Sequence, residues 1–595
     1  MGSANMLTAA AAESSKKVSR VWQKGSAYIP IGSSSSRSCR ADSITDDLCS
    51  PSICHVLMLL ISVAMFTSTL VLLQSLRTNQ AVCFVPRFSK WRSSPSNPDL
   101  TLQDKLGEAD ELNAPNDKEW LLKQSEENGT ASCHNARTTQ AMLFGIDQPA
   151  WRGGNVRLQT NQNHQILLVS YTEDGSRRCS GGDFYETDLS GPSWKSRPTV
   201  KDLGDGSYLV DLKVDSRQTG LYSLKVVLLF DNLHGLDVNP EPWILAKEVV
   251  QLKLEFIDEL KSSLWSDLQL CNKDDFRHGS WRGRWTRAKA NESCTADDEG
   301  RFKCLNPGEE CEPPWCEGPV GSLESNGWVY SAHCAFRIFT QQEAWTCLSD
   351  RWLFFWGDSN HQDTIRNLLN FVLGRQDSNL GRTFESTFSN PRNSSQFLKI
   401  TSYFNGHFTE SDNNLGLASL ADSDYRHRLS SYFLPTNPSV PDAVILNSGL
   451  HDGKPWTNLT HYVHGARRAS SFWGNLWRAS RAGSSARPKM LFRTTVAPAG
   501  EFRNKPANPQ KMEVYNTILG ELLVSEFGPS NLQVVDAYDM TFPWHFDNQC
   551  SDGGHYGRPP ALNSWLGIRT GHHYFVDVML AHVLLNALCP LQQIA

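Results

Sequence analysis

Two short stretches of this 595-residue sequence carry side chains that together could perform acyl chemistry. The first is Gly357-Asp358-Ser359, which follows an apolar run at residues 352–356. A serine on the turn between a buried strand and a helix lies close to free backbone N–H groups and to the positive end of the helix dipole. Ser359 is therefore a candidate nucleophile. The alternative is that Asp358 or Ser359 merely caps the helix.

The second stretch is CSDGGHYGRP at residues 550–559, where Asp552 precedes His555 by three positions. An acid that orients an imidazole, which in turn deprotonates a serine hydroxyl, is the arrangement that activates serine nucleophiles. We therefore expect Ser359, Asp552 and His555 to form a catalytic triad in the chain order Ser, Asp, His. A histidine without function in a glycine-rich turn is the alternative for His555.

The elements that would position these residues alternate between strand and helix from residue 349 to 595, which predicts an α/β domain. Strands are expected at 352–356, 443–446, 490–492 and 532–535, and helices at 512–524 and 575–588. Polar residues follow each strand, and open parallel sheets bind ligands at the carboxyl ends of their strands. Asn447 and Gly449 are therefore candidate oxyanion donors beside the Ser359 backbone N–H. A simple turn role is the alternative for Asn447.

The length of the chain predicts about three or four folded units rather than one core. Its net charge is −6, with 20% charged and 10% aromatic residues, an ordinary composition for a globular protein. No basic surface is indicated, so we expect no nucleic-acid partner.

The N-terminal region reads as a tail, an anchor and a stem. Residues 1–52 are rich in Ala and Ser without an apolar period, which predicts a disordered cytosolic tail. Residues 53–76 begin with ICHVLMLLISVAMFTSTLVLL, which is long enough to cross a bilayer, whereas a cleaved signal peptide would be shorter and nearer the start. Residues 77–134 are polar and Pro-containing and are expected to form a stem.

Glycosylation sequons and cysteines indicate that the bulk of the chain is luminal. The sequons begin at Asn128, Asn291, Asn393 and Asn458, all after the anchor. Twelve of the fifteen cysteines also follow it, an even number that suits disulfides in an oxidising compartment. A zinc site is the alternative for a cluster of cysteines in the middle of the chain, but the spacings lack paired C-x2-C motifs, and we expect no metal. These are Cys304, Cys311, Cys316, Cys334 and Cys347.

Two further units precede the α/β domain. Residues 135–256 hold short alternating runs at 165–171, 207–214 and 222–230, which predict an antiparallel β-sandwich. The stretch GDGSY at 204–208, followed by LVDL and GLYSL, looks like the later strands of a filamin-type immunoglobulin-like repeat. This unit is either a docking module for glycans or proteins or a spacer. Residues 257–348 form a Cys- and Trp-rich connector whose tryptophans are expected to be core residues rather than sugar-stacking platforms.

Several of these motifs together carry a family resemblance. The GDS turn, the DGGH motif, VILNSGLHD at 444–452 and LFRTT at 491–495 resemble the PC-esterase branch of the SGNH/GDSL hydrolase superfamily. YSAHCAFR at 330–337 and CLSDRW at 347–352 resemble the same branch. With a sandwich and an anchor ahead of it, residues 135–595 are similar to the neurexophilin and PC-esterase family. Gln362 stands where many relatives have an arginine.

The resemblance implies a Golgi-membrane, single-pass type II protein whose relatives include glycan O-acetyltransferases. It makes Ser359 the nucleophile and matches Gly406, in YFNGH, to a second oxyanion glycine. His361 and Arg493, in the same motifs, are expected to contact the substrate. No cofactor is expected to stay bound; the acetyl donor is acetyl-CoA or a group relayed by a transporter partner, and the acceptor is a glycan or polysaccharide.

Three functions are compatible with these residues. The first is a glycan O-acetyltransferase that works through a serine acyl-enzyme. The second is a glycan or lipid esterase with the same triad, because the two reactions differ only in whether a sugar or water accepts the acyl group. The third is a neurexophilin-like binding protein without catalysis, which would have no need of Ser359, Asp552 and His555.

Overall fold

The computed structural model describes sixteen stretches of the chain, and the expectations for the tail, the anchor, most of the stem, Asn128 and Asn291 lie outside them. No helix within these stretches is long and apolar enough to cross a membrane. The described residues are 133–134, 136–144, 156–216, 218–258, 268–277, 281–286, 328–375, 380–406, 415–434, 439–453, 458–480, 487–546, 551–557, 561–563, 568–570 and 575–589.

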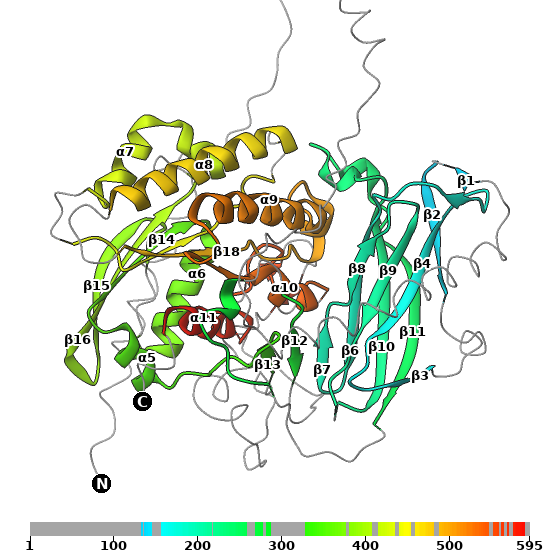
Figure 1. Cartoon of the computed structure of the whole chain (residues 1–595), viewed down its shortest axis with the longest axis horizontal. Coiled ribbons are helices and arrows are strands. Elements are labelled where there is room, and N and C mark those ends of the chain that lie inside the picture. The colour runs from blue at the N-terminus through cyan, green and yellow to red at the C-terminus, as the bar shows by residue number, and fades with distance from the viewer. Residues whose placement is uncertain are drawn as a thin grey trace, which may run out of the picture. The chain divides into compact units, whose positions relative to one another are not determined.

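The first folded region contains two β-sheets that face each other (Figure 1). One sheet has the order β1-β5-β4-β9-β8, with β2 paired to β4, and the other has the order β13-β12-β7-β6-β10-β11-β3. The first comprises β1 (Cys133–His134), β2 (Thr138–Phe144), β4 (His164–Thr172), β5 (Arg177–Arg178), β8 (Thr199–Asp202) and β9 (Ser207–Leu212). The second comprises β3 (Val156–Gln159), β6 (Phe184–Gly191), β7 (Trp194–Ser196), β10 (Gly220–Phe230), β11 (Lys247–Ile257), β12 (Arg284–Thr286) and β13 (Val329–Ser331).

Alternating apolar residues from both sheets make the core of this sandwich. Leu168 and Val210 of one sheet and Leu224 and Leu254 of the other are fully buried in one cluster. Along β11 buried and more exposed residues alternate, as expected for a strand with one face on a core. The predicted strands correspond to β4, β9 and β10, whereas the immunoglobulin-like relationship stays a prediction.

The connector does not form a separate core in the described residues. Its strands β12 and β13 extend the second sheet of the sandwich. Its tryptophans Trp281, Trp285 and Trp328 are buried in the same cluster as the apolar residues of the C-terminal domain. The indole N–H of Trp285 donates to the carbonyl oxygen of Met540 at 2.8 Å. The connector therefore joins the sandwich to the C-terminal domain through shared packing.

The C-terminal domain is built on a sheet of order β15-β16-β14-β17-β18-β19. All neighbours are parallel except β15, which pairs antiparallel with β16. This confirms the predicted mainly parallel α/β sheet and its four strands, but the β15–β16 hairpin was not predicted. The strands are β14 (Arg351–Gly357), β15 (Phe384–Asn390), β16 (Asn393–Phe404), β17 (Ala443–Leu446), β18 (Lys489–Arg493) and β19 (Leu532–Val535), and a small hairpin joins β20 (Ala561–Asn563) to β21 (Ile568–Thr570).

Helices cover both faces of this sheet: α7, α8 and α9 lie on one side, and α6 and α11 on the other (Figure 1). The predicted helices at 512–524 and 575–588 correspond to α9 and α11. The α-helices are α5 (Gln341–Leu348), α6 (Ser359–Asn367), α7 (Ser423–Ser431), α8 (Leu459–Ala479), α9 (Pro509–Phe527), α10 (Ala537–Thr541) and α11 (Phe575–Leu588); a π-helical turn, η5 (Leu368–Val372), continues α6. Short 3-10 turns are η2 (His234–Leu236), η3 (Glu241–Trp243), η4 (Asp275–Arg277), η7 (Gly416–Ala421), η8 (Gly500–Asn504) and η9 (Phe542–Trp544).

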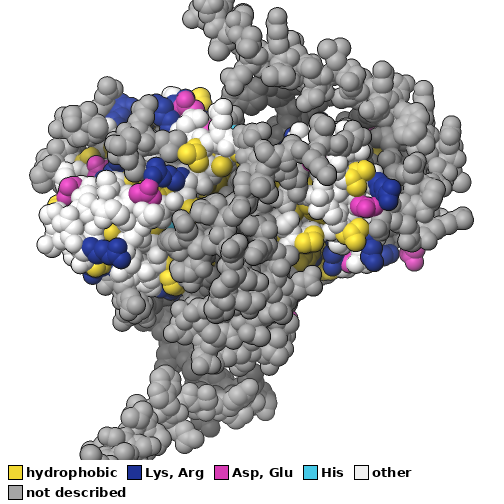
Figure 2. Space-filling model, turned by 90° about the horizontal axis from the view of Figure 1, so that it is seen from below, with side chains coloured by type: hydrophobic (Ala, Val, Ile, Leu, Met, Phe, Trp, Pro, Cys, Tyr) yellow, Lys and Arg dark blue, Asp and Glu magenta, His cyan; other side chains and the backbone are white. Residues whose placement is uncertain are grey.

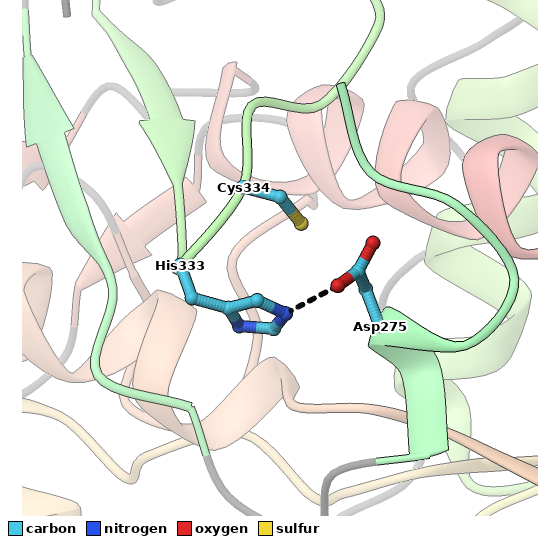
Figure 3. A group of neighbouring side chains, drawn as sticks. All are labelled: Asp275, His333 and Cys334. Carbon is cyan, nitrogen blue, oxygen red and sulfur yellow. Dashed lines mark hydrogen bonds and ion pairs between the residues drawn. The ribbon is translucent and has the colours of Figure 1, made fainter. Parts of the chain in front are cut away.

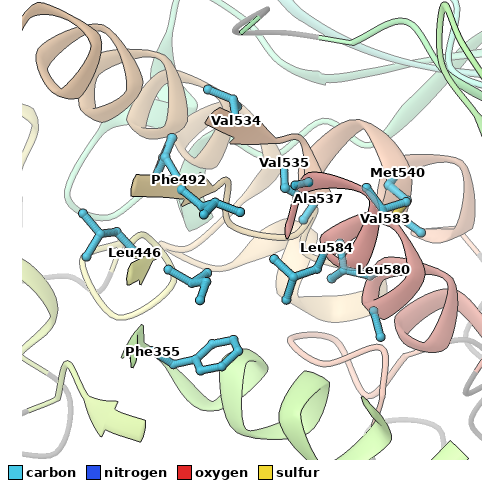
Figure 4. Close-up of a cluster of buried hydrophobic side chains, with 14 of the residues drawn as sticks. Phe355, Leu446, Phe492, Val534, Val535, Ala537, Met540, Leu580, Val583 and Leu584 are labelled. Carbon is cyan, nitrogen blue, oxygen red and sulfur yellow. The ribbon is translucent and has the colours of Figure 1, made fainter. Parts of the chain in front are cut away.

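An apolar core packs the sheet against α11 and so holds the carboxyl ends of the strands in place. Phe355, Leu446 and Phe492 come from three neighbouring strands and are buried against Leu580 and Leu584 of α11 (Figure 4). Burying one such side chain contributes about 1.5–3 kcal/mol. Because both faces of the sheet are covered, its central strands are apolar almost throughout, which is why the sequence shows them as continuous apolar runs.

Charged side chains of both signs are interspersed on the described surface (Figure 2). Pairs such as Lys399–Glu385 at 2.8 Å and Lys225–Glu248 at 3.0 Å neutralise each other locally. Exposed pairs of this kind contribute at most about 1 kcal/mol to stability.

Candidate active site

Ser359 is the first residue of α6 and lies two positions after Gly357, the last residue of β14. The preceding Asp358 caps the helix, since its side chain accepts the Asn360 N–H at 2.9 Å. The cap and the nucleophile candidate are thus neighbouring residues, and the two interpretations of the turn are not exclusive. Ser359 is 6% exposed, and as the first helical residue it has a backbone N–H without an intrahelical acceptor.

The structure brings Ser359, His555 and Asp552 together. The hydroxyl Oγ of Ser359 lies 2.6 Å from Nε2 of His555. On the other side of the ring, Nδ1 lies 3.0 Å and 3.1 Å from the two carboxylate oxygens of Asp552. A carboxylate only accepts hydrogen bonds, so Nδ1 carries the proton and Nε2 offers a lone pair to the serine hydroxyl. In this arrangement His555 can take the serine proton.

The loop that carries the histidine is organised by Asp552. One carboxylate oxygen accepts the backbone N–H groups of Gly554 at 3.0 Å and His555 at 2.9 Å, in addition to the ring. Gly553 has φ of +105°, a conformation that side-chain-bearing residues rarely adopt. Asn360 donates through Nδ2 to the carbonyl oxygen of Gly554 at 3.0 Å, which ties the loop to α6. Sequence reasoning missed Asn360, although its position directly after Ser359 was a signal.

The predicted oxyanion donors cluster at the strand ends, and all are buried. Asn447 follows β17 and donates through Nδ2 to the carbonyl oxygen of Arg493 at 3.2 Å. This bond uses one of the two N–H groups of the side-chain amide. Gly449 packs against Thr495, where an added Cβ would lie 2.7 Å from a methyl group. Gly406 is a buried residue two positions after β16.

Asn405 was not predicted but lies among these residues. Its backbone N–H donates to the carbonyl oxygen of Gly357 at 2.9 Å, which extends the β14–β16 pairing to the serine turn. Its side-chain amide donates to the carbonyl oxygen of Asn447 at 3.3 Å and to Oγ of Ser448 at 3.0 Å. Asn405 therefore links the strand ends on either side of β14. Its place beside Gly406 in the sequence was the available signal.

The predicted substrate contacts His361 and Arg493 are both buried, at 1% and 2% exposure. The His361 ring lies under Gly357, where an added Cβ would be 2.3 Å from Nδ1. Burial lowers the pKa of His361 well below its usual range, and the positive charge of Arg493 lowers it further, so the ring is neutral at pH 7. Burial also lowers the pKa of Arg493, against the attraction of Asp577. A substrate would reach either side chain only through a change of conformation.

A buried acid behind the strand ends was also missed. Asp452 accepts the Leu417 N–H at 2.7 Å and contacts the Ser448 hydroxyl at 2.5 Å. Burial raises the pKa of Asp452 to about 7, although these hydrogen bonds act in the opposite direction. Gln362, the departure from the family pattern, donates its side-chain amide to the carbonyl oxygen of Leu380.

Among the described residues, one group of side chains has the types and the spacing of metal ligands, but one of its members is in a disulfide. Asp275 and His333 are 3.0 Å apart and lie beside Cys334 (Figure 3). The sulfur of Cys334 is bonded to Cys271, so it is not a free thiolate ligand. Cys347 is likewise bonded to Cys589, while the other cysteines of the zinc alternative, Cys304, Cys311 and Cys316, lie outside the described residues.

Two of the predicted glycosylation sites are described. Asn393 is exposed at the start of β16, and its side-chain oxygen accepts hydrogen bonds from the N–H and the hydroxyl of Ser395. Asn458 caps α8, since its side chain accepts the His461 N–H at 2.8 Å. Glycosylation at either site stays a prediction.

No protein-family model matches this sequence, and no curated protein matches it either. Solved structures similar to part of the chain include the acetylxylan esterase Axe2 from Geobacillus stearothermophilus, at 12% identity over 41% of this chain and 96% of that chain, with a TM-score of 0.23. Another is LAE5, an alpha/beta hydrolase enzyme from the metagenome of Lake Arreo, Spain, at 11% identity over 40% of this chain and 95% of that chain, also with a TM-score of 0.23. The functional assignment therefore rests on this chain's own residues.

Proposed function

We propose that this protein is a glycan O-acetyltransferase that works through an acyl-enzyme on Ser359. The observation that carries the proposal is the continuous hydrogen-bonded line from Ser359 through His555 to Asp552, with a 2.6 Å contact between the hydroxyl and the imidazole. A serine at a helix start, an imidazole with its lone pair toward the hydroxyl and a carboxylate behind it are the parts of an activated nucleophile.

In the first half-reaction His555 takes the Ser359 proton as Oγ attacks the carbonyl carbon of the acetyl donor. The resulting tetrahedral oxyanion collapses, the donor's C–S or C–O bond breaks, and His555 returns the proton to the leaving group. In the second half-reaction His555 deprotonates a sugar hydroxyl, which attacks the acetyl-serine and releases Ser359 with its proton restored. Asp552 holds the imidazole and stabilises the imidazolium in both halves.

The oxyanion would be held at the N-terminus of α6. The Ser359 N–H is free of helical bonds, and the helix dipole favours negative charge there. The second N–H of the Asn447 side chain and the backbone N–H groups of Gly406 and Gly449 are the further candidate donors. Removal of one such donor from an oxyanion hole typically costs about 10²–10³ in kcat.

The acceptor class and the cellular setting follow from the family resemblance. The proposal is a type II Golgi-membrane enzyme, held by the segment at 53–76, with its catalytic domain in the lumen. The acceptor would be a glycan or polysaccharide hydroxyl, and the donor acetyl-CoA or an acetyl group relayed by a membrane transporter. The Cys271–Cys334 and Cys347–Cys589 disulfides support a compartment that is oxidising.

An ester hydrolase is the second candidate, because part of the triad is open to solvent. The side chains of His555 and Asp552 are 17% and 31% exposed. Water that reaches the acyl-enzyme would accept the acetyl group in place of a sugar, and exclusion of water is what favours transfer.

The test is mass spectrometry of the full-length protein after incubation with an isotopically labelled acetyl donor and a panel of glycans. Acetyl on Ser359 and then on a sugar supports the transferase, whereas acetyl on Ser359 that is released only as acetate supports the esterase. Ser359→Ala should abolish both, and Ser389→Ala, at an exposed serine of β15, is the matched control. Full turnover by the Ser359→Ala protein would refute the mechanism.

A further inference from the structure

A buried carboxylate of the β-sandwich reaches into the C-terminal domain. Glu186 lies on β6 and is 0% exposed. Its side chain accepts two hydrogen bonds from the Arg503 guanidinium, one from Nε at 3.0 Å and one from a terminal nitrogen, and its Oε1 also lies 3.0 Å from Nε2 of His545. Burial of an ionised carboxylate costs free energy unless the group is paired and hydrogen-bonded. Both partners of Glu186 lie more than 300 residues after it in the sequence.

This cluster is an ion pair rather than a neutral contact. Burial by itself would raise the pKa of Glu186, but the charge of Arg503 and the contact with His545 outweigh burial and lower the pKa to about 2. Glu186 is therefore ionised at physiological pH. A two-pronged guanidinium–carboxylate contact also fixes the relative orientation of the two side chains, because both groups are planar.

The two partners of Glu186 belong to segments that support the loop of residues 551–557, which contains His555 and is called the histidine loop below. Arg503 lies in the short turn η8. The residues at the start of this turn donate hydrogen bonds both to the histidine loop and to the segment that contains His545. The Ala499 N–H donates to the carbonyl oxygen of Gly553 at 2.8 Å, and the Gly500 N–H donates to the carbonyl oxygen of His545 at 3.3 Å. The turn thus bridges the segment that contains His545 and the loop that contains His555.

Side chains of the same turn pack against the loop. The Phe502 ring lies so close to Gly553 that a Cβ at this glycine would be 2.4 Å from a ring carbon. On the other side of His555, the hydroxyl of Tyr556 donates a hydrogen bond to the carbonyl oxygen of Ala497 at 2.8 Å. The residues on both sides of His555 therefore rest on the stretch from 497 to 503, and a shift of Arg503 would move their support.

We propose that Glu186 is a positioning residue: the β-sandwich sets the place of His555 through the Glu186–Arg503 and Glu186–His545 contacts and the η8 turn. The inference rests on the proposed serine chemistry and deepens it, since it gives the sandwich a part in the active site. A second ion pair between the same regions, Arg197–Glu513 at 2.7 Å, ends on α9. Among the described residues neither side chain makes a hydrogen bond or ion pair with residues 551–557, so this pair provides a matched control.

The experiment measures the reactivity of Ser359 directly, with a fluorophosphonate probe that labels activated serines, in the full-length protein. Glu186→Gln removes the charge and keeps the shape. We expect its second-order labelling rate, and its kcat for acetyl release or transfer, to fall about tenfold to a hundredfold, because small displacements of a catalytic base have effects of this size. KM should change less than kcat, since substrate contacts are untouched. Glu513→Gln should label at the wild-type rate.

A second variant covers the case in which Glu186→Gln does not fold. Arg503→Lys keeps the positive charge opposite Glu186 and removes the two-pronged contact, and it should lower the labelling rate in the same direction. A folded Glu186→Gln or Arg503→Lys protein with the wild-type labelling rate would overturn the inference, as would an equal loss in Glu513→Gln. Failure of the proposed function looks different, because the wild-type protein would then label no faster than Ser359→Ala.

Discussion

Asn360 donates a hydrogen bond of 3.0 Å to the carbonyl oxygen of Gly554, so the residue that follows the candidate nucleophile holds the loop of the candidate base. Asn360 is buried and 194 residues away from Gly554 in sequence. The contact fixes the approach of His555 to Ser359 from the side of α6.

Replacement of Asn360 by Ala should therefore reduce both activity and stability. Loss of a buried hydrogen bond costs about 1–3 kcal/mol of folding free energy, whereas a loosened base lowers kcat by about tenfold or more. Steady-state kinetics and thermal unfolding on the same preparation check this. Asn475→Ala, at an exposed asparagine of α8, is the control. An Asn360→Ala protein with the wild-type kcat would show that the loop is held elsewhere.

Asp552→Asn tests the role of the carboxylate behind the imidazole. An amide at this position no longer stabilises the imidazolium and can present an N–H to Nδ1, which favours the wrong tautomer of His555. We expect kcat to fall about 10³–10⁴-fold, with an unchanged thermal midpoint because the loop keeps an oxygen acceptor. Kinetics at saturating donor measure it. Retention of more than a tenth of the wild-type kcat would exclude Asp552 as the orienting acid.

Asp452 predicts a pH dependence of stability. Its pKa is raised by burial from 3.8 to about 7 in the folded state, so the folded protein binds this proton more tightly than the unfolded chain does. Its contribution to stability is therefore fully present below about pH 4 and is lost as pH rises to about 7.

Asp452→Asn mimics the protonated acid and should remove this dependence. Compared with the wild-type protein, its apparent thermal midpoint should be higher at pH 8 and higher by a smaller amount at pH 5, because the stability lost on ionisation of Asp452 grows between about pH 4 and pH 7. Thermal unfolding at the two pH values measures the difference. A midpoint difference that is the same at both pH values would mean that Asp452 does not titrate in this range.

The Cys347–Cys589 disulfide should contribute more to stability than Cys271–Cys334. The first closes a loop of 242 residues between the ends of α5 and α11, and the second closes one of 63 residues. Loss of a native disulfide costs about 2–5 kcal/mol, and chain entropy makes the longer loop worth about 1 kcal/mol more. Paired Cys→Ser variants, compared by denaturant unfolding, check the order. A larger loss from the shorter loop would point to strain or packing instead of entropy.

Much of the α/β domain follows from local sequence patterns. The apolar runs of β14, β17, β18 and β19 and the periodic helices α9 and α11 report burial on both faces of a sheet, which short windows reveal. The β15–β16 hairpin was not predicted because β15 is an edge strand with only two buried residues, so its sequence resembles that of a polar loop.

Residue types and their local patterns identify the side chains that could do the chemistry: a serine on a strand-to-helix turn, an acid three residues before a histidine, and polar residues at the ends of strands. Which of these side chains contact one another depends on the packing of distant segments. Ser359 and His555 are 196 residues apart in the chain, and their contact depends on Asn360, on the η8 turn and on Glu186 from another sheet. Such contacts leave no local pattern, because a side chain's type and its neighbours in sequence report whether it is buried, not which distant segment buries it.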